Sequence, residues 1–279
     1  MTLMDAIFAG IIQGLTEFLP VSSSGHLVVF RYFYGVHGMS LGFDTLLHLG
    51  TLIAVCAALW QDIVAIGSEV ITGKGCGRKT ALALIIATIP GAVFGFVFAD
   101  RIDALFVEKG ITIGGIPLAP YQVVGLAFIV TAHFVLRPAN ELLKRRAEKN
   151  IAGAGPAGLT LAQAGLIGLA QAVAVIPGIS RSGATIAAGL HSGLSRDYAA
   201  RFSFLMSIPI VLGAVAHKLP EMWVPFLYDE HKGILIAGVV AAAVTGFLAV
   251  RFMLRLLVTG DLHRFIVYLW VIGLLCVAS

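Results

Sequence analysis

Charged residues are scarce in this sequence of 279 residues. Asp, Glu, Lys and Arg make up only 12% of it, whereas 58% of the residues are hydrophobic. A soluble domain carries roughly 25% charged residues, so this depletion excludes an ordinary water-soluble fold and indicates that lipid is the main solvent. The net charge of +4 is small, and the basic residues lie in short loops. That pattern is typical of a membrane protein and excludes a nucleic-acid-binding surface.

Cysteine is also rare. Cys56, Cys76 and Cys276 are scattered, odd in number and without the spacing of metal ligands, which excludes a disulfide framework and a cysteine metal centre. The N-terminus contains Asp5 and has no Lys or Arg before its apolar run, so no signal peptide is expected. We therefore predict one membrane domain over residues 1–279.

The sequence does contain long apolar runs. Two of them, Leu3–Leu19 and Leu161–Ile176, run directly into polar breaks at Pro20–Gly25 and Pro177–Gly183. We interpret each of these regions as a re-entrant pair of helices joined by a loop. The remaining six runs are predicted to be full transmembrane helices. They are Phe43–Trp60, Thr80–Ala99, Tyr121–Leu136, Tyr198–Lys218, Gly233–Val250 and Phe265–Ala278.

The two broken regions resemble each other. When the sequence is shifted by 158 positions, Thr2–His26 aligns with Thr160–Ala184 without a gap. The identical pairs are Thr2/Thr160, Leu3/Leu161, Ala6/Ala164, Gly10/Gly168, Gln13/Gln171, Ser22/Ser180, Ser24/Ser182 and Gly25/Gly183. These matches predict an internal repeat, with repeat one over residues 1–137, a cytoplasmic linker over 138–158 and repeat two over 159–279.

Loop charge predicts how the repeats are oriented. The loops 73–79, 137–158 and 251–264 carry a basic excess, whereas 100–119 and 218–232 carry an acidic one. Because basic loops stay in the cytoplasm, the first broken region enters the membrane from outside and the second from the cytoplasm. The fold class predicted is therefore an all-α polytopic membrane protein with an inverted-topology repeat, whose two breaks meet near the midplane.

The first break combines acid, imidazole and hydroxyl groups. Gln13 and Glu17 are four positions apart and share one helical face. Glu17 and His26 then flank three hydroxyls, Ser22, Ser23 and Ser24, which are followed by Gly25. A carboxylate at membrane depth costs roughly 2.5–3.5 kcal/mol on insertion scales, so we interpret this cluster as functional.

The second break carries a cation. Arg181 occupies the position equivalent to Ser23, and a guanidinium at membrane depth needs an anionic partner. Ser180, Ser182, Gly183 and Thr185 surround it with hydroxyl and backbone donors, as in an anion site at the start of a helix. The anionic partner of Arg181 would be a phosphate, or Glu17 in the resting state. Together the breaks hold the groups that phosphoryl transfer requires.

The motifs Gln13-x-x-x-Glu17-Phe-Leu-Pro-Val-Ser-Ser-Ser-Gly-His26 and Pro177-Gly-x-Ser-Arg181-Ser-Gly-Ala-Thr185 closely resemble the two signatures of the undecaprenyl-diphosphatase family, also known as bacitracin-resistance proteins. The resemblance extends over essentially the whole chain. It implies a multi-pass enzyme of the bacterial inner membrane with an outward-facing active site. Such an enzyme removes the terminal phosphate of undecaprenyl diphosphate, recycles the lipid carrier for peptidoglycan synthesis and confers bacitracin resistance.

The resemblance also implies roles for single residues. Glu17, His26 and Arg181 match motif positions, as do Ser22 and Ser23. A divalent cation, Mg²⁺ or Ca²⁺, is implied, with Glu17 as its candidate ligand. The family carries Glu or Gln at the position of Gln13, and a neutral amide is the weaker metal ligand.

Several alternatives stay open at this stage. Ser23, His26 or a water would be the nucleophile, with Glu17 orienting His26. Asp44 and His48 share a helical face that would lie near the site or begin a solvated helix. The main alternative function is a carrier that flips undecaprenyl phosphate across the membrane, because secondary transporters use inverted repeats. Small residues, Gly125, Gly238 and Gly246, permit close packing within the chain or in a homodimer.

Overall fold

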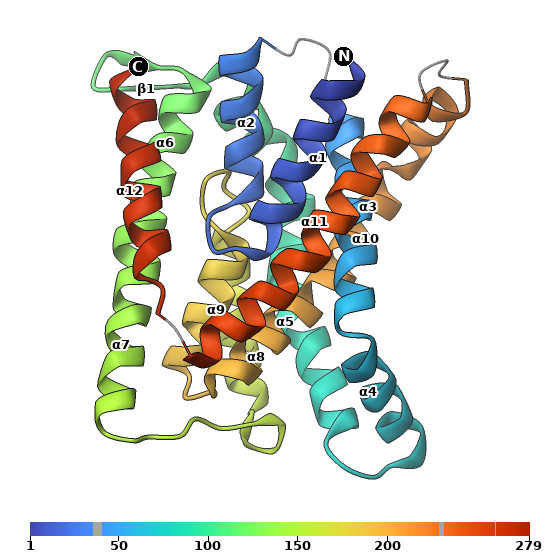
Figure 1. The fold of residues 1–279 in the computed structure, drawn as a ribbon, viewed down its shortest axis with the longest axis vertical. Coiled ribbons are helices and arrows are strands. Elements are labelled where there is room, and N and C mark those ends of the chain that lie inside the picture. Colours follow the sequence, from blue (N-terminus) through green and yellow to red (C-terminus); the bar gives the residue numbers. More distant parts are fainter. Residues whose placement is uncertain (36–40, 229–231, 260) are drawn as a thin grey trace.

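A computed structural model describes residues 1–35, 41–228, 232–259 and 261–279, and nearly all of them are helical (Figure 1). The helices before residue 150 are α1 (Leu3–Phe18), α2 (Ser23–Tyr34), α3 (Leu41–Ala58), α4 (Trp60–Thr72), α5 (Gly77–Asp103), α6 (Pro120–Val130) and α7 (Arg137–Glu148). Those after it are α8 (Leu161–Val173), α9 (Arg181–His191), α10 (Arg196–Tyr228), α11 (Lys232–Thr259) and α12 (His263–Ala278). Two π-helical segments, Ala104–Lys109 and Thr131–Leu136, continue α5 and join α6 to α7, and a 3-10 turn, Pro156–Gly158, precedes α8.

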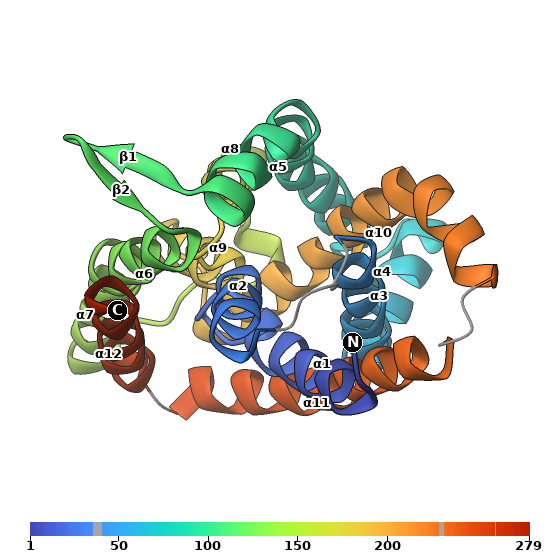
Figure 2. The same cartoon turned by 90° about the horizontal axis from the view of Figure 1, so that it is seen from above.

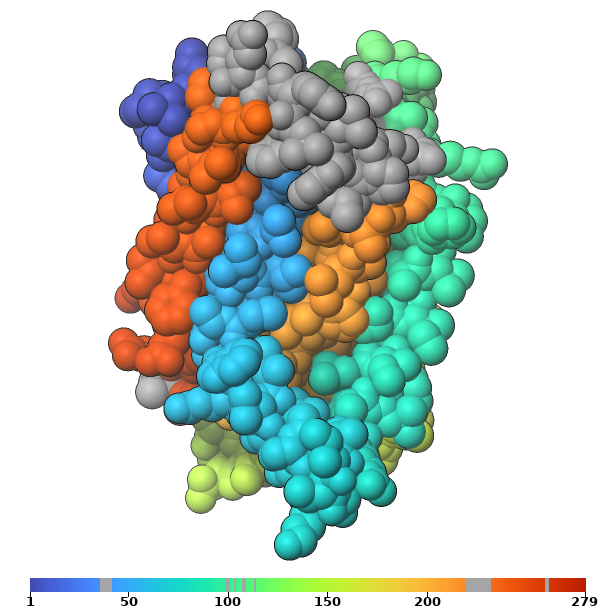
Figure 3. Space-filling view, turned by 90° about the vertical axis from the view of Figure 1, so that its right-hand side faces the viewer, coloured from blue at the N-terminus to red at the C-terminus, as the bar shows by residue number. Residues whose placement is uncertain are grey.

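Long apolar helices make this an all-α membrane protein. Within the described residues, four helical segments are long and apolar enough to cross a bilayer. They are Gly77–Phe98, Pro120–Glu148, Arg196–Lys218 and Lys232–Val258. Their outer surfaces expose large apolar side chains such as Ile85, Val240 and Leu248, which is the expected surface for contact with lipid. Figure 3 shows one such face, formed by α11, α3, α10 and α5.

The six predicted spans are all helical, but two of them differ from simple crossings. The predicted span Phe43–Trp60 falls on α3, which is followed after a 71° bend by α4. The predicted span Phe265–Ala278 falls on α12, a shorter apolar helix of 16 residues. The helix that contains the predicted span Tyr121–Leu136 is longer than expected, because it continues through α7 into the region assigned to a linker.

A short β-hairpin interrupts the helical chain between α5 and α6. Strands β1 (Ile111–Ile113) and β2 (Ile116–Leu118) pair antiparallel, with Ile113 opposite Ile116. Gly114 and Gly115 form the two-residue turn, with φ angles of 58° and 85° that side chains rarely adopt. The all-α prediction missed this element.

Helices from the two halves of the chain pack against each other. The helix α1 contacts α11 along much of its length, and α8 contacts α5. A Cβ added to Gly10 would lie 2.2 Å from the carbonyl oxygen of Gly238, and one added to Gly168 would lie 2.5 Å from that of Ala87. Gly125, Gly238 and Gly246 all contact other helices of the same chain.

The ends of the bundle differ in their loops. Both termini and the β-hairpin lie at one end, whereas the loops after α4 and α7 lie at the other (Figure 1). Those two loops have the basic excess, and the hairpin belongs to the acidic loop 100–119. Viewed from the end that carries the termini, α2 lies inside the ring made by the longer helices (Figure 2). The breaks after α1 and α8 therefore meet within the bundle.

Candidate active site

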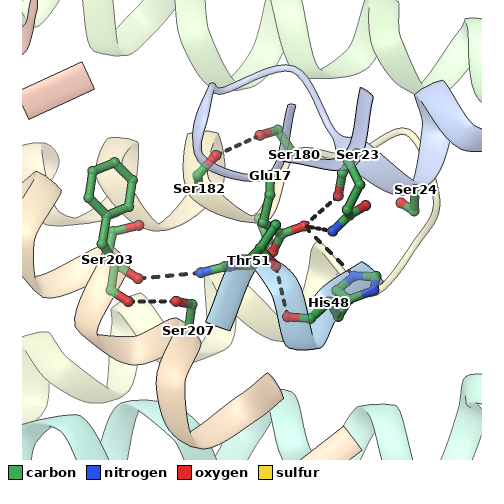
Figure 4. Close-up of polar contacts among 12 residues, drawn as sticks. Glu17, Ser23, Ser24, His48, Thr51, Ser180, Ser182, Ser203 and Ser207 are labelled. Carbon is green, nitrogen blue, oxygen red and sulfur yellow. Dashed lines mark hydrogen bonds and ion pairs between the residues drawn. The ribbon is translucent and has the colours of Figure 1, made fainter. Parts of the chain in front are cut away.

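A buried carboxylate, Glu17, is the centre of the polar cluster (Figure 4). It lies in the last turn of α1 and is 9% exposed. Its Oε2 accepts hydrogen bonds from Gln13 Nε2 at 2.9 Å and from Ser23 Oγ at 2.6 Å. Its Oε1 pairs with Arg181 Nη2 at 2.5 Å. One carboxylate thus joins a hydroxyl of the first break to the cation of the second through different oxygens.

The first break has an unusual backbone at Ser22. Its φ of 70° lies in the left-handed region that L-residues rarely adopt, and such a conformation costs of order 1–3 kcal/mol. Contacts on both sides hold it in place. The Ser22 carbonyl accepts a hydrogen bond from His26 Nδ1 at 2.7 Å, and Ser22 Oγ accepts one from Gly178 N at 3.2 Å. The second contact connects the two breaks directly.

Two glycines allow the breaks to approach each other. A Cβ on Gly25 would lie 2.6 Å from Phe128 Cε1 and 3.0 Å from the Cα of Gly178. Gly178 itself has a φ of 93°, a conformation that glycine adopts without steric cost. Its carbonyl accepts a hydrogen bond from Thr131 Oγ1 at 3.0 Å, which anchors the second break to the helical segment between α6 and α7.

The second break begins α9 in a way that positions Arg181. Ser180 is the N-cap of that helix, and its Oγ accepts a hydrogen bond from Gly183 N at 3.1 Å, the usual way to satisfy a first-turn amide. Ser182 Oγ donates to the Leu19 carbonyl at 2.9 Å and so ties α9 to the first break. Arg181, in the first turn, then points toward Glu17.

Hydroxyls from α9 and α10 complete the side of the site behind Arg181. Thr185 Oγ1 and Ser203 Oγ lie 2.6 Å apart, and the Ser203 carbonyl lies 3.4 Å from Arg181 Nη1. The prediction included Thr185 but not Ser203. Because Ser203 is in an apolar span far along the chain, only tertiary packing brings it to the guanidinium.

The structure brings His48 to the carboxylate. His48 Nε2 lies 3.7 Å from Glu17 Oε2, and the side chain is 32% exposed. Its Nδ1 donates to the Asp44 carbonyl at 2.8 Å, so the ring is fixed with Nε2 toward the site. The side chain of Asp44 pairs with Arg31 on α2. Of the two positions that stayed open for this helical face, the structure shows the one near the site, because His48 faces Glu17.

His26 takes a different position from the one expected. Its Nδ1 donates to the Ser22 carbonyl, and its Nε2 lies 2.7 Å from the hydroxyl of Tyr268 on α12. Its ring packs between those of Phe128 and Tyr268, with centroid distances of 4.9 and 5.7 Å. Both ring nitrogens are engaged away from Glu17, so the expectation that Glu17 orients His26 is wrong for this conformation.

The remaining predicted residues line the breaks. Gln13, Ser22, Ser23, Ser180, Ser182 and Thr185 are buried, whereas Ser24 is exposed and lies 3.4 Å from Ser22 Oγ. Gln13 Oε1 is buried without a hydrogen-bond partner within the described residues. Among those residues, no three His, Cys, Asp or Glu side chains are close enough to hold a metal ion. Any cation here would need oxygens from a ligand as well.

The fold and the site define a polytopic helical membrane protein whose polar centre lies between two helix breaks. The family described as bacitracin resistance protein BacA matches residues 6–275, and this chain belongs to that family.

Relatives of similar length support this assignment. An undecaprenyl-diphosphatase of Moorella thermoacetica is 39% identical, with 100% of this chain and 98% of the relative aligned. Proteins of the same name from Rubrobacter xylanophilus and Caldicellulosiruptor bescii are each 38% identical, over 99% and 96% of this chain and 97% and 94% of theirs.

Proposed function

We propose that this protein is a membrane phosphatase that hydrolyses undecaprenyl diphosphate to undecaprenyl phosphate and inorganic phosphate. This reaction would recycle the lipid carrier used for peptidoglycan synthesis. One observation carries the proposal. In this chain, which belongs to the family, the buried carboxylate of Glu17 contacts the Ser23 hydroxyl at 2.6 Å and the Arg181 guanidinium at 2.5 Å. A base, a nucleophile and a charge stabiliser are thereby assembled at one point.

Ser23 is the nucleophile that this geometry favours. Glu17 Oε2 takes the proton of Ser23 Oγ as the Oγ–P bond to the terminal phosphorus forms. The bond from that phosphorus to the bridging oxygen breaks, and undecaprenyl phosphate leaves with the bridging oxygen. Water then attacks the phosphoserine, releases inorganic phosphate and restores the serine. A nucleophilic His26 is disfavoured because both of its ring nitrogens are engaged.

Arg181 stabilises the charge that develops on the phosphoryl oxygens. Because it pairs with Glu17 Oε1 while Ser23 bonds to Oε2, it need not leave the carboxylate for the serine to be activated. His48 Nε2 is on the side of Oε2. Because Nδ1 already donates to the Asp44 carbonyl, the ring would donate from Nε2 to a phosphate oxygen in its protonated, imidazolium form. A planar guanidinium suits the diphosphate because it makes bidentate contacts with phosphate oxygens.

A divalent cation, Mg²⁺ or Ca²⁺, belongs to the proposal. Magnesium sites in proteins that act on phosphates commonly use one or two carboxylates, substrate oxygens and water. Glu17 and the unpartnered Gln13 Oε1 fit that donor set and would hold the ion, which would add positive charge at the diphosphate.

We further propose that the two halves form an inverted repeat with the site open to the outer face. Thr2 and Thr160, equivalent under the 158-residue shift, each cap their helix in a reciprocal capping box. Under the same shift, α8 is equivalent to α1 and α11 is equivalent to α5. The contact of α1 with α11 is therefore equivalent to the contact of α8 with α5, and each joins the two halves. The basic loops at one end of the bundle support a cytoplasmic assignment for that end.

The alternative of a lipid phosphate carrier explains less of the site. A carrier needs a cation such as Arg181, but it has no use for a serine hydroxyl bonded to a buried carboxylate. The Ser23–Glu17 contact therefore favours the phosphatase.

Phosphate release from undecaprenyl diphosphate by the purified protein in detergent with Mg²⁺ tests the proposal. We expect wild type to release phosphate and Ser23→Ala to lose at least about 10³-fold in rate. Ser207→Ala is the matched control, because Ser207 is also buried but, within the part of the chain that the structure describes, its hydroxyl bonds to its own helix, at the Phe204 carbonyl. Absence of release by folded wild type, or equal rates for Ser23→Ala and Ser207→Ala, would overturn the assignment.

A further inference from the structure

A cavity lies apart from Glu17, at the end of the bundle that carries the basic loops. It has a volume of about 510 Å³ and is enclosed by α7, the start of α10, the last turns of α11 and the start of α12. Figure 1 shows the last turn of α11 and the start of α12 beside α7. Lys144, Arg196 and Arg264 line the cavity together with a single carboxylate, Asp261. Positive charge is therefore in excess.

The walls of this cavity are held by hydrogen bonds between helices. Arg196 Nη2 donates to the Leu143 carbonyl at 2.9 Å, which joins α10 to α7. The buried side chain of Asn140 on α7 accepts a hydrogen bond from Leu262 N at 2.8 Å, which joins α7 to the residue before α12. The basic residues thus lie on elements already fixed relative to one another, so little order is lost when a ligand binds.

One wall of the cavity is apolar and faces outward. Phe252 and Leu256 share one face of α11, and Phe265 lies across from them on α12. Phe252 is 52% exposed in the last part of a membrane-spanning segment, so its surroundings are acyl chains. The cavity therefore combines cationic groups with direct access from lipid.

The positive-inside rule accounts for basic residues at this end of the bundle. It does not account for the convergence of three of them from three helices on one cavity with an apolar outer wall. A ligand that matches both features has an anionic phosphate at one end and a hydrocarbon chain at the other.

We propose that this cavity binds the phosphate headgroup of an anionic phospholipid. Lys144, Arg196 and Arg264 contact the phosphate, and the acyl chains lie along Phe252 and Leu256. Basic pockets between transmembrane helices on the cytoplasmic side are suited to such headgroups. The site is independent of the proposed phosphatase reaction.

Thermal unfolding of the purified full-length protein in neutral detergent provides the test. Short-chain phosphatidylglycerol, short-chain phosphatidylcholine and inorganic phosphate are titrated separately. We expect phosphatidylglycerol to raise the Tm more than phosphatidylcholine. In Lys144→Gln/Arg264→Gln the midpoint of that titration should move to roughly 30-fold higher concentration, because two cationic contacts are lost. Both side chains are exposed, so their replacement leaves the fold intact.

The matched control is Arg145→Gln/Lys149→Gln, which removes the same charge from exposed positions at the end of α7 that do not line the cavity. Its midpoint should match wild type. If inorganic phosphate alone reproduces the shift and Lys144→Gln/Arg264→Gln abolishes it, the ligand is a free phosphate bound by the same cations. Equal effects of the two lipids, or equal losses in both double variants, would overturn the proposal.

Discussion

The ion pair between Glu17 and Arg181 yields the sharpest prediction. Their side chains are only 8% and 15% exposed, so removing one partner leaves the other charge buried without the opposite charge that it pairs with. Breaking such a pair costs about 3–5 kcal/mol, which for a chain of this size corresponds to a Tm lower by roughly 10 °C. We expect this loss in Arg181→Met, which keeps most of the aliphatic stem, and in Glu17→Gln.

The double variant Glu17→Gln/Arg181→Met should recover most of that stability. It contains no buried unpaired charge, and the glutamine amide still bonds to its polar neighbours. Thermal unfolding in detergent, monitored for the four proteins of the cycle, measures the coupling between the two sites. Arg201→Met is the control. Arg201 pairs with Asp62 at a more exposed position, with side chains 35% and 26% exposed, so its loss should cost only about 1 kcal/mol. Additive losses in the double variant would refute the reasoning, because they would mean that the pair carries no buried charge interaction.

Two further predictions concern the imidazole and the contact between the breaks. His48→Ala should lower kcat/KM about 10²-fold, the usual scale for losing one hydrogen-bond donor to the transition state. His191→Ala, which removes a ring bonded to its own helix carbonyl in the same manner, should leave the rate unchanged, and equal rates in both variants would exclude a role for His48. Gly25→Ala places a Cβ 2.6 Å from Phe128 and should lower the Tm, because overpacking costs about 1–3 kcal/mol. Gly165→Ala, where nothing lies within 4 Å of the new Cβ, should raise the Tm slightly; a Tm increase in both variants would contradict the close approach of the breaks.

Local sequence signals predict the two breaks and the two charges that meet between them. Pro20 and Pro177 interrupt apolar runs, and the Ser/Gly-rich residues that follow are typical of a helix start. Glu17 and Arg181 were the two charges at membrane depth in equivalent regions, and each needed a partner of opposite sign. Burial energetics therefore predicts an anionic partner for Arg181, and Glu17 is one of the two candidates that the sequence leaves open; the structure contains that contact.

The surroundings of that pair could not be predicted in the same way. His48 and Ser203 reach the site because α3 and α10 pack beside it, and no local pattern reports that packing. His26 is adjacent to the serines in sequence, but α2 turns its ring toward Phe128 and Tyr268. Helical rotation after a strained residue such as Ser22 decides which neighbour faces Glu17, and the strain itself is not visible in the sequence.

Other differences between prediction and structure do have signals in the sequence, but the pattern of long apolar spans outweighed them. The segment Ile111–Leu118 contains two short Ile-rich stretches around Gly114 and Gly115, which is a hairpin pattern. The prediction of long apolar spans obscured it. The continuation of helix past Leu136 follows from the strong helix formers in α7. Arg146 also bonds to the carbonyls of Leu190 and Leu194, so charged residues there pack against α9 instead of forming a loop.

The most direct test of the central claim is phosphate release from undecaprenyl diphosphate by Glu17→Gln/Arg181→Met. This variant is expected to remain folded, so lost activity cannot be attributed to unfolding. With Mg²⁺ supplied, we expect release by wild type and a rate at least about 10³-fold lower in the double variant, because base and charge stabiliser are both missing. A double variant that keeps its thermal stability and releases phosphate at a rate near that of wild type would contradict the claim that the two breaks form one active site.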